Sequence, residues 1–388
     1  MSLVNDDKDY YIKTDNLYVP EKVEGEAFLH ISDGKIVEIL YSKPTDELDI
    51  LDLTGFIVGP GFVDVHIHGY GGHDSIEGSF DAIQSIALGL SSRGVTAFLP
   101  TTTANFVDNL KKIVSVSLEF DKIKGARPLG FHLEGPFLSK SEPGAMDPNL
   151  FETPSIGKVK ELIESGIIRM MTIAPELDNA LEVISFLYKN GVAIALGHSA
   201  TDFETATKAF IHGSNSITHF FNAMPQFHHR SPSLIGAGFV YPFYLQFIAD
   251  GVHTHHSTIR IVTKYLKDRL VLITDAIMAA GLDKPGVYRL GDFDIIVDNI
   301  SARLSNGTLA GSILTMDKGF RNLVNIGELS ISEAFKCAST NPCLSIGETG
   351  RGAIREGNFA DFVVLTKDEL SVYITIREGK IVYERRRS

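Results

Sequence analysis

Residues 59–69 read GPGFVDVHIHG, an apolar strand that ends in two histidines instead of a glycine-rich phosphate loop. Side chains two positions apart on a strand face the same side, so His66 and His68 should share one face and Val65 and Ile67 the other. An open, doubly wound sheet that binds a dinucleotide would carry its glycine fingerprint after this strand, and that fingerprint is missing. The stretch therefore favours a closed α/β barrel, with the open sheet as the alternative.

Further apolar runs alternate with helical patterns along the middle of the chain. The expected strands cover 62–68, 96–100, 128–134, 169–174, 192–197, 216–221, 244–249 and 270–275. The expected helices cover 79–92, 106–120, 155–165, 178–190, 202–212, 257–267 and 314–326, with an irregular link after the sixth strand and a β-like excursion over 287–304. Eight β-then-α steps over about 250 residues match the number and the size of a (β/α)8 barrel.

The two ends of the chain show a different pattern from the middle, with short strands joined by tight turns at 33–34 and 378–379. The expected strands there cover 26–31, 35–41, 361–366, 372–377 and 380–383. This pattern predicts one small β-sandwich domain from residues 1–58 and 355–388, attached to a barrel of residues 59–354. Two unrelated hairpins are the alternative.

The composition excludes several classes of function. The chain has 388 residues, with 36 Lys and Arg against 48 Asp and Glu, so its net charge of −12 argues against nucleic-acid binding. No apolar run approaches the roughly 18 residues that span a bilayer, and the first residues lack the apolar segment of a secretory signal. The 2 cysteines, Cys337 and Cys343, are too few for a disulfide framework, which favours a cytoplasmic location.

Metal-binding residue types stand at five of the expected strands. These residues are His66 and His68 in the first strand, Glu134 in the third, His198 in the fifth, His219 in the sixth and Asp275 in the eighth. Each of these residues by itself could have a purely structural role, as a histidine packed in the core or as a cap residue. The C-terminal ends of barrel strands meet on one face, however, and there the set predicts a site for one or two Zn²⁺ or Fe²⁺ ions.

The pattern also suggests how such a site would work. A metal held by Glu134, His198 and His219 leaves a position open for water, whose pKa falls to roughly 7 at favourable zinc sites. The histidine pair of the first strand could hold a second metal. Asp275 is the expected acceptor of the water's proton and its donor to a leaving nitrogen. His132 shares the face of Glu134, where it either supports a ligand or simply packs beneath the site.

A second group of residues suggests an anion site. Asn222 and Ala223 follow the sixth strand, Arg230 lies beyond them, and His253 follows the seventh strand. An arginine fork and a histidine suit a phosphate or a carboxylate, although Arg230 could equally be an exposed loop cation. Residues 308–312, TLAGS, could donate backbone N–H groups to a substrate or could be an ordinary helix start.

Seven motifs in this order resemble the amidohydrolase superfamily and, within it, its N-acetylglucosamine-6-phosphate deacetylase branch. The motifs are GPGFVDVHIHG (59–69), GFHLEGPFL (130–138), LGHSATD (196–202), THFFNAM (218–224), ADGVH (249–253), ITDAIMAAGL (273–282) and GTLAGSILTMD (307–317). HLEGPF and TLAGS are much more specific to this branch than the HxH pair is.

The resemblance implies a TIM-like barrel with a small β-sandwich, and hydrolysis of N-acetyl-D-glucosamine 6-phosphate to D-glucosamine 6-phosphate and acetate in amino-sugar catabolism. It implies a principal metal on Glu134, His198 and His219, with Asp275 as the general acid/base. It also implies a homodimer in which Arg230 reaches the neighbouring site. The implied substrate contacts are Ala145, Asn222, Ala223, Arg230, His253, Leu309, Ala310 and Gly311.

This chain has features on which members of the branch differ. Some members have lost the HxH pair, whereas this chain keeps it, so two metals are plausible. Many relatives carry a histidine where this chain has Met146, which changes the sugar contact there. The strand-four lysine of the cyclic-amide branch has no counterpart in residues 169–173. The alternative functions are a deacetylase for the galactosamine epimer and a non-catalytic barrel that senses a metal or a sugar phosphate.

Overall fold

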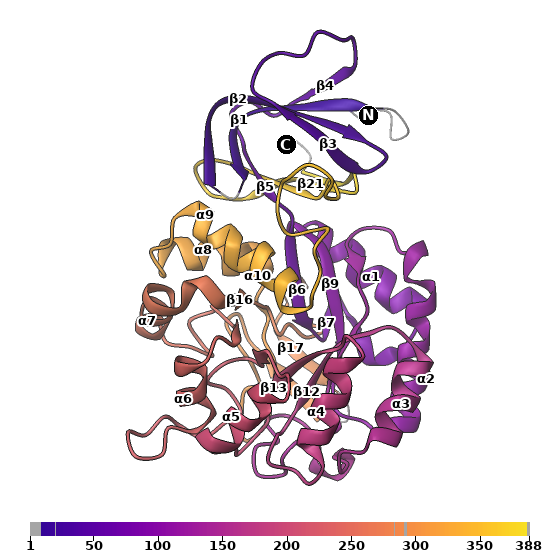
Figure 1. Cartoon of the computed structure of the whole chain (residues 1–388), viewed down its shortest axis with the longest axis vertical. Helices are drawn as coiled ribbons and strands as arrows, with labels where there is room; N and C mark the ends of the chain where they lie inside the picture. The colour runs from indigo at the N-terminus through magenta and orange to yellow at the C-terminus, as the bar shows by residue number, and fades with distance from the viewer. Residues whose placement is uncertain (1–8, 20, 283, 291–292, 386–388) are drawn as a thin grey trace.

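The computed structural model describes residues 9–19, 21–282, 284–290 and 293–385, which form a barrel and a smaller β domain beside it (Figure 1). Eight parallel strands build the barrel, which is nearly closed. They are β6 (Phe62–Ile67), β9 (Val95–Thr102), β11 (Phe131–Glu134), β12 (Ile168–Ile173), β13 (Ala193–Leu196), β14 (Ser216–Ile217), β15 (Tyr244–Phe247) and β16 (Leu270–Leu272). A short strand, β10 (Arg127–Pro128), also pairs with β9. The expected α/β barrel is thus confirmed.

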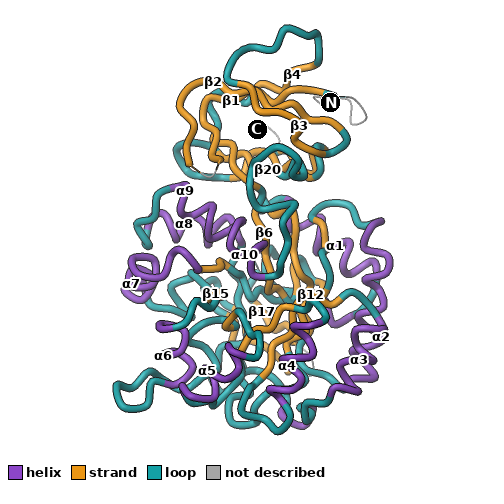
Figure 2. The backbone as a smooth tube through the Cα atoms, in the orientation of Figure 1, coloured by secondary structure: helices purple, strands orange, loops and turns teal. Residues whose placement is uncertain are grey.

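A helix follows each barrel strand and lies outside the strands (Figure 2). These helices are α1 (Phe80–Ser91), α2 (Val107–Val114), α3 (Ile156–Ser165), α4 (Ala180–Lys189), α5 (Phe203–Ile211), α6 (Ser233–Val240), α7 (His256–Leu266) and α8 (Met316–Asn325). Helix α6 occupies the link that the sequence left irregular. Its sequence, SLIGAGFV, has no charged residue, so it shows no polar face with helical period. Among the described residues, no helix is both long and apolar enough to cross a membrane.

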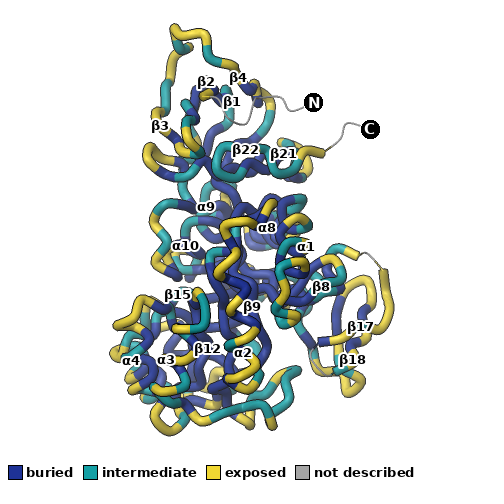
Figure 3. Tube along the Cα trace, turned by 90° about the vertical axis from the view of Figure 1, so that its right-hand side faces the viewer, coloured by how far each residue is buried: buried dark blue, intermediate teal, exposed yellow. Residues whose placement is uncertain are grey.

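Short elements complete the barrel. Helices α9 (Ile331–Phe335) and α10 (Asn341–Ser345), joined by a π-helical turn (Lys336–Thr340), lie between the barrel and the β domain (Figure 1). The 3₁₀ turns are η1 (Ser75–Glu77), η2 (Ser115–Lys122), η3 (Pro148–Leu150) and η4 (Lys267–Arg269), and β7 (Gly69–Tyr70) pairs with β8 (His73–Asp74). The expected excursion is a small antiparallel sheet of β17 (Gly286–Leu290), β18 (Phe293–Val297) and β19 (Ala302–Arg303), which projects from the side of the barrel (Figure 3).

The barrel strands are apolar on both faces because both faces are covered. One cluster, which includes Leu99, Met170 and Ile273, fills the interior, and a larger one packs the outer faces against the helices. Val65 belongs to the interior cluster and Ile67 to the outer one, so the prediction that they share a face was wrong. The pairing of β6 with β9 shifts register between Asp64 and Ile67, which breaks the strict alternation of side chains.

A buried carboxylate ties the first barrel strand to the last. Asp64 accepts hydrogen bonds from the hydroxyl of Thr274 (2.6 Å) and from its backbone N–H (3.3 Å), while the N–H of Asp275 donates to the carbonyl of His66 (2.9 Å). Burial raises the pKa of Asp64 to about 6. The contacts fix two strand ends against each other, and each of those ends carries a candidate site residue.

The small domain combines strands from both ends of the chain. They are β1 (Tyr10–Val19), β2 (Glu21–Ser32), β3 (Lys35–Leu40), β4 (Asp49–Asp52), β5 (Ile57–Pro60), β20 (Phe362–Leu365), β21 (Val372–Arg377) and β22 (Lys380–Glu384). A single mixed sheet runs β22-β21-β20-β5-β1-β2-β3, with β4 beside β1, and its core draws apolar side chains from both ends. One joint domain is therefore confirmed, and the alternative of two unrelated hairpins is wrong.

An ion-pair network fastens the end of the chain to the barrel. The carboxylate of Glu378 accepts from Arg127 of β10 through Nε (3.2 Å) and Nη2 (2.8 Å), and Arg351 pairs with both Glu378 and Asp361. Burial opposes the charge on Glu378, but the two arginines prevail and lower its pKa to about 2. Since β5 runs almost directly into β6, the N-terminal ends of the barrel strands face this junction and their C-terminal ends point away from it.

Candidate metal and substrate site

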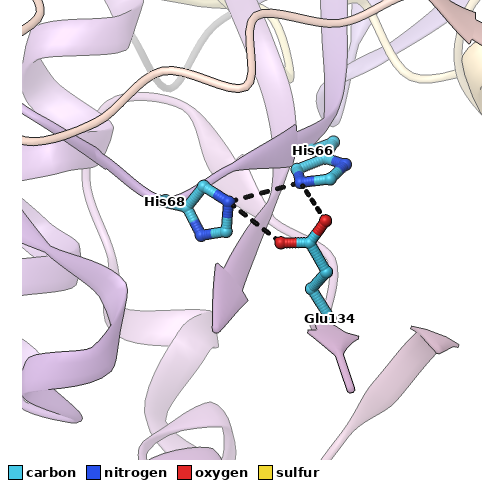
Figure 4. Close-up of side chains that lie close together, drawn as sticks. All are labelled: His66, His68 and Glu134. Atoms are coloured by element: carbon cyan, nitrogen blue, oxygen red, sulfur yellow. Dashed lines mark hydrogen bonds and ion pairs between the residues drawn. The ribbon is translucent and has the colours of Figure 1, made fainter. Parts of the chain in front are cut away.

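Imidazole and carboxylate groups from separate strands meet at the C-terminal end of the barrel. His66 lies on β6 and His68 just after it, Glu134 ends β11, and His198 and His219 follow β13 and β14. All five are at most 5% exposed. Two overlapping groups could each hold a metal ion, Glu134 with His198 and His219, and Glu134 with His66 and His68. Figure 4 shows the second group, with both histidines turned toward the carboxylate.

The first group has a donor set that calls for a cation. Nε2 of His198 and Nε2 of His219 lie 3.0 Å apart, and each lies 3.0–3.1 Å from Oε1 of Glu134. The Nδ1 atoms of the two rings face the carbonyl oxygens of Glu142 (2.9 Å) and Asn222 (3.1 Å), which only accept hydrogen bonds. Each Nδ1 therefore carries a proton, and in the neutral tautomer the two Nε2 lone pairs face each other beside a carboxylate. This set fits a divalent metal.

The second group also brings two imidazole nitrogens to Glu134. Nε2 of His66 lies 3.4 Å from Nε2 of His68, and both atoms lie within 3.5 Å of Glu134. They also lie 3.3 Å and 3.1 Å from Oδ1 of Asp275. Nδ1 of His66 donates to the side-chain oxygen of Gln246 (3.0 Å), which leaves its Nε2 lone pair turned toward the site. Asp275 thus stands beside both His66 and His68, here called the histidine pair of β6 after the strand that carries the first of them.

The charges of the site support one another. Burial disfavours the ionised carboxylates, but the histidines outweigh it, so the pKa of Glu134 lies well below its ordinary value and that of Asp275 falls to about 2. Burial likewise opposes charge on His66 and His68, yet the two carboxylates raise the pKa of both rings. Two buried negative groups therefore favour positive charge between them, whether it is supplied by protons or by a metal.

The backbone is strained where it presents these side chains. His198, His219 and Asp275 have φ angles of 47°, 26° and 51°, in the left-handed region that side chains other than glycine rarely adopt. Each stands just beyond its barrel strand, where the chain turns from the strand to the loop. Such strain costs on the order of 1–3 kcal/mol per residue and persists only where the surroundings impose it. Phe221 and Ala223, which follow His219, adopt the same region, with φ angles of 83° and 51°.

His132 packs beneath the site. Its Nδ1 lies 3.0 Å from the carbonyl of Val65, and its Nε2 lies 2.8 Å from the hydroxyl of Thr172, which in turn lies 2.8 Å from the hydroxyl of Thr218. Its ring meets that of His66 edge-on, with centroids 4.7 Å apart. Burial lowers the pKa of His132 well below its ordinary value, so this ring is a neutral support under His66.

A cavity of about 460 Å³ opens above the metal-binding groups. The predicted substrate residues that line it are Ala145, Asn222, Ala223, His253, Leu309 and Gly311. His253 is held by Asp250, whose carboxylate lies 2.7 Å from its Nδ1. Ala310 is buried, and its N–H donates to the carbonyl of Ala302. Arg230 is exposed on the loop after β14, where its Nη1 lies 2.9 Å from His229, and it is not among the described residues around this cavity.

Sequence reasoning missed several residues of the site. Gln246, which orients His66, gave one usable signal, because it is a polar residue within the apolar run YLQFI. Arg303, Thr103 and Leu290 line the cavity but gave no signal. Two of them, Arg303 and Leu290, come from the small projecting sheet, whose position over the barrel no local pattern reveals.

Comparisons with known proteins agree with this geometry. Residues 57–382 match the sequence model of the Amidohydrolase family. The chain is 32% identical over 97% of its length to the N-acetylglucosamine-6-phosphate deacetylase of Bacillus subtilis (strain 168), covering 96% of that protein. It is 35% identical over 92% of its length to the deacetylase of the same name from Danio rerio, covering 93% of it.

A solved structure agrees over the whole fold. A mutant N-acetyl-D-glucosamine-6-phosphate deacetylase from Mycobacterium smegmatis, in complex with N-acetyl-D-glucosamine-6-phosphate, superposes with a TM-score of 0.90 at 32% identity. The match covers 97% of this chain and 99% of that one.

Proposed function

The chain belongs to the amidohydrolase family and, within it, to the N-acetylglucosamine-6-phosphate deacetylases, and from this premise we propose its reaction. It hydrolyses N-acetyl-D-glucosamine 6-phosphate to D-glucosamine 6-phosphate and acetate. The single observation that carries this proposal is the set of facing Nε2 lone pairs around Glu134, which lies under a cavity large enough for a sugar phosphate.

Each residue near Glu134 has a proposed part. Glu134, His198 and His219 would hold the principal divalent metal, and the histidine pair of β6 would hold a second. When bound, such a metal polarises the acyl carbonyl and makes a nearby water a stronger nucleophile. The rings of His198, His219 and His66 reach the site with their lone pairs already aimed, because Glu142, Asn222 and Gln246 accept from their Nδ1 atoms.

Asp275 is the proposed general acid/base. Its low pKa keeps it ionised at neutral pH, so it is ready to accept a proton from the attacking water. It can then pass that proton to the nitrogen of the sugar as the C–N bond breaks, which lets the amine leave as a neutral group. The contacts of Asp64 with Thr274 hold the neighbouring residue and so fix the carboxylate of Asp275 against His66.

The substrate would lie along the lining of the cavity. Asn222, Ala223 and His253 line the cavity and are the proposed contacts of the sugar phosphate, with Ala145 and the backbone of Leu309–Gly311 as further contacts. Arg230 lies outside the cavity of its own chain. We propose that it reaches the site of a neighbouring copy in a homodimer, where its guanidinium would pair with the phosphate.

Further parts of the proposal concern the whole protein. Zn²⁺ and Fe²⁺ are the proposed metals because the ligands are imidazole and carboxylate without thiolate. The proposed domain bounds are 1–58 with 355–388 for the small domain and 59–354 for the barrel, and the outermost residues of both ends lie outside the described ones. The cytoplasm is the proposed location, since Cys337 and Cys343 are both free thiols.

One experiment tests the reaction. The purified protein is analysed for bound metal, and acetate release from N-acetylglucosamine 6-phosphate is measured with and without a chelator. We expect at least one metal per chain and acetate release that the chelator abolishes. Substrate binding without acetate release would favour a sensor instead. A parallel assay with N-acetylgalactosamine 6-phosphate tests the epimer, and faster turnover of that sugar would overturn the assignment of substrate.

A further inference from the structure

A second cavity, of about 200 Å³, adjoins the substrate cavity. The two share four lining residues, Thr103, Ala145, Met146 and Leu290. Because four residues line both cavities, we treat the smaller one as an extension of the substrate site. It is here named the side cavity. The sugar-phosphate contacts proposed above, Asn222 and His253, line the larger cavity and are not among the described residues of the side cavity.

The side cavity is mostly apolar. Besides the shared residues, the apolar Ile76, Ala104, Leu150 and Phe293 line it, together with the polar Asn105 and Asp147. Apolar walls offer a water molecule few hydrogen-bond partners. An apolar cavity next to a polar active site therefore favours an alkyl or aryl group. This chemistry indicates an occupant that belongs to the apolar part of a substrate.

Met146 stands between the two cavities. It lines both, and its Sδ lies 3.5 Å from the backbone nitrogen of Ala104, which donates to it. Methionine is unbranched and adapts its shape at little cost, so the partition is movable. The segment that carries it also borders the metal-binding group, because a Cβ on Gly144 would lie 2.9 Å from Cε1 of His198.

We infer that the side cavity accepts the alkyl chain of N-acyl groups longer than acetyl, and that Met146 sets the limit on their length. The inference rests on the proposed deacetylase function. In any such amide the acyl carbon must lie at the metal-binding residues, so its alkyl chain begins in the cavity that these residues share with Gly144 and Met146. Water supplies the oxygen of the new C–O bond, the C–N bond breaks, and the leaving nitrogen takes a proton, giving a carboxylate and glucosamine 6-phosphate.

The size of the side cavity suits this occupant. A dry cavity of about 150 Å³ holds a benzene molecule, so this one has room for a chain of several carbons. A pocket shaped only for acetyl would instead reject each extra methylene by roughly 10–200-fold in kcat/KM. The two cases therefore predict clearly different preferences.

The experiment compares N-acetyl, N-propionyl and N-butyryl glucosamine 6-phosphate with the metal-loaded enzyme. We expect kcat/KM for the propionyl and butyryl substrates to stay within about tenfold of the acetyl value, because their chains enter a preformed apolar space. Good acetyl turnover with a loss of about a hundredfold or more for butyryl would overturn the inference and leave the deacetylase function intact. Failure to hydrolyse any of the three would overturn the proposed function itself.

Variants locate the effect in the side cavity. Leu150→Trp and Ile76→Trp each fill it from a residue that lines the side cavity and is not among the described residues in the wall of the substrate cavity, and each should lower the butyryl-to-acetyl ratio of kcat/KM at least tenfold. Met146→Ala removes the partition and should raise that ratio. Met278→Ala is the matched control, since Met278 is not among the described residues that line either cavity. Filling variants that leave the ratio unchanged would overturn the inference, and acetyl turnover in the same preparations reports on folding.

Discussion

At the scale of single residues, the orientation of each histidine ring matters as much as its presence. The spacing of His66 and His68 predicts that they point the same way, and the strand ends predict that they meet Glu134. The proton positions could not be predicted, because the carbonyl of Glu142 and the amide of Gln246 set two of them from distant segments, and the carbonyl of Asn222 sets the third through the turn after His219. A sequence shows which side chains can bind a metal, whereas the surrounding fold decides which nitrogen is free.

Asp275→Asn tests the proposed proton carrier. The amide keeps the size of the side chain but cannot accept the proton, so kcat should fall roughly 10²–10⁴-fold, as is typical for a positioned acid/base. Metal content, measured on the same samples, should stay that of the wild type. Asp108→Asn, on an exposed position of α2, is the control. Wild-type turnover in Asp275→Asn would remove the assigned role.

Gln246→Leu tests the support of His66. Without the acceptor at 3.0 Å, the ring loses the partner that fixes its proton on Nδ1. Metal affinity at the β6 pair should fall roughly 10–100-fold, while the metal on Glu134, His198 and His219 is retained. Titration with a metal-binding competitor dye measures both affinities. Gln84→Leu, at a contact between α1 and Lys124, is the control, and an unchanged titration of Gln246→Leu would contradict the expectation.

At the scale of elements, the period of apolar residues decides what can be predicted. Apolar strands that alternate along the chain with helices that have one polar face are predictable. The order of the strands around the barrel follows from this alternation. Helix α6 and the register shift of β6 are not, because a helix without charged residues has no detectable face and a shifted pairing leaves no trace in composition. Helices α9 and α10 are not predictable either, because five residues each are too few to show a helical period.

Gly59 shows how tightly the strand that links the two domains is packed. A Cβ at this position would lie 2.1 Å from Cζ of Phe335, whose ring lies among Phe62, Phe320 and Tyr18. Gly59→Ala should therefore destabilise the protein by roughly 1–3 kcal/mol, the usual cost of overpacking a core. Gly157→Ala is the matched control, because its Cβ would meet only Ser155 Oγ at 3.6 Å and it lies in α3.

Urea denaturation of both variants measures the difference. The control should be as stable as the wild type or gain about 0.5–1 kcal/mol from its better helix propensity. A Gly59→Ala variant as stable as the wild type would show that the ring of Phe335 moves aside at no cost.

At the scale of the whole molecule, Glu378 and its arginines hold the small domain to the barrel. Its pKa of about 2 lies below the ordinary 4.5, so the ion pairs stabilise the folded state fully above pH 4.5 and lose that contribution as the pH falls toward 2. The shift corresponds to roughly 3 kcal/mol. Glu378→Gln should therefore be less stable than the wild type by about this amount at pH 7.

The difference between the two proteins should shrink steadily below pH 4.5, as followed by urea denaturation at several pH values. Glu164→Gln, on an exposed position of α3, should match the wild type throughout. A deficit of Glu378→Gln that stays constant down to pH 2 would show that its cause is not the charge of the carboxylate.

The proposed homodimer can be tested by mixing inactive variants. If Arg230 completes the site of its neighbour, an Arg230→Ala chain paired with an Asp275→Asn chain contains one complete site. Random reassociation of equal amounts should then restore about a quarter of wild-type activity, since half of the dimers are mixed and each has one working site of two. No gain over the separate variants would mean that Arg230 acts within its own chain or not at all.

The pairing of β5 with β20 also has a consequence for biosynthesis. Residues 57–60 leave the ribosome some three hundred positions before their partner strand, residues 362–365, so the nascent polypeptide completes its barrel while one edge of the β domain is still open. That edge is a template for pairing with other chains until translation ends. A chain that stops before residue 362 would therefore have a complete barrel beside an unpaired strand edge. Such an edge favours aggregation and binding by chaperones.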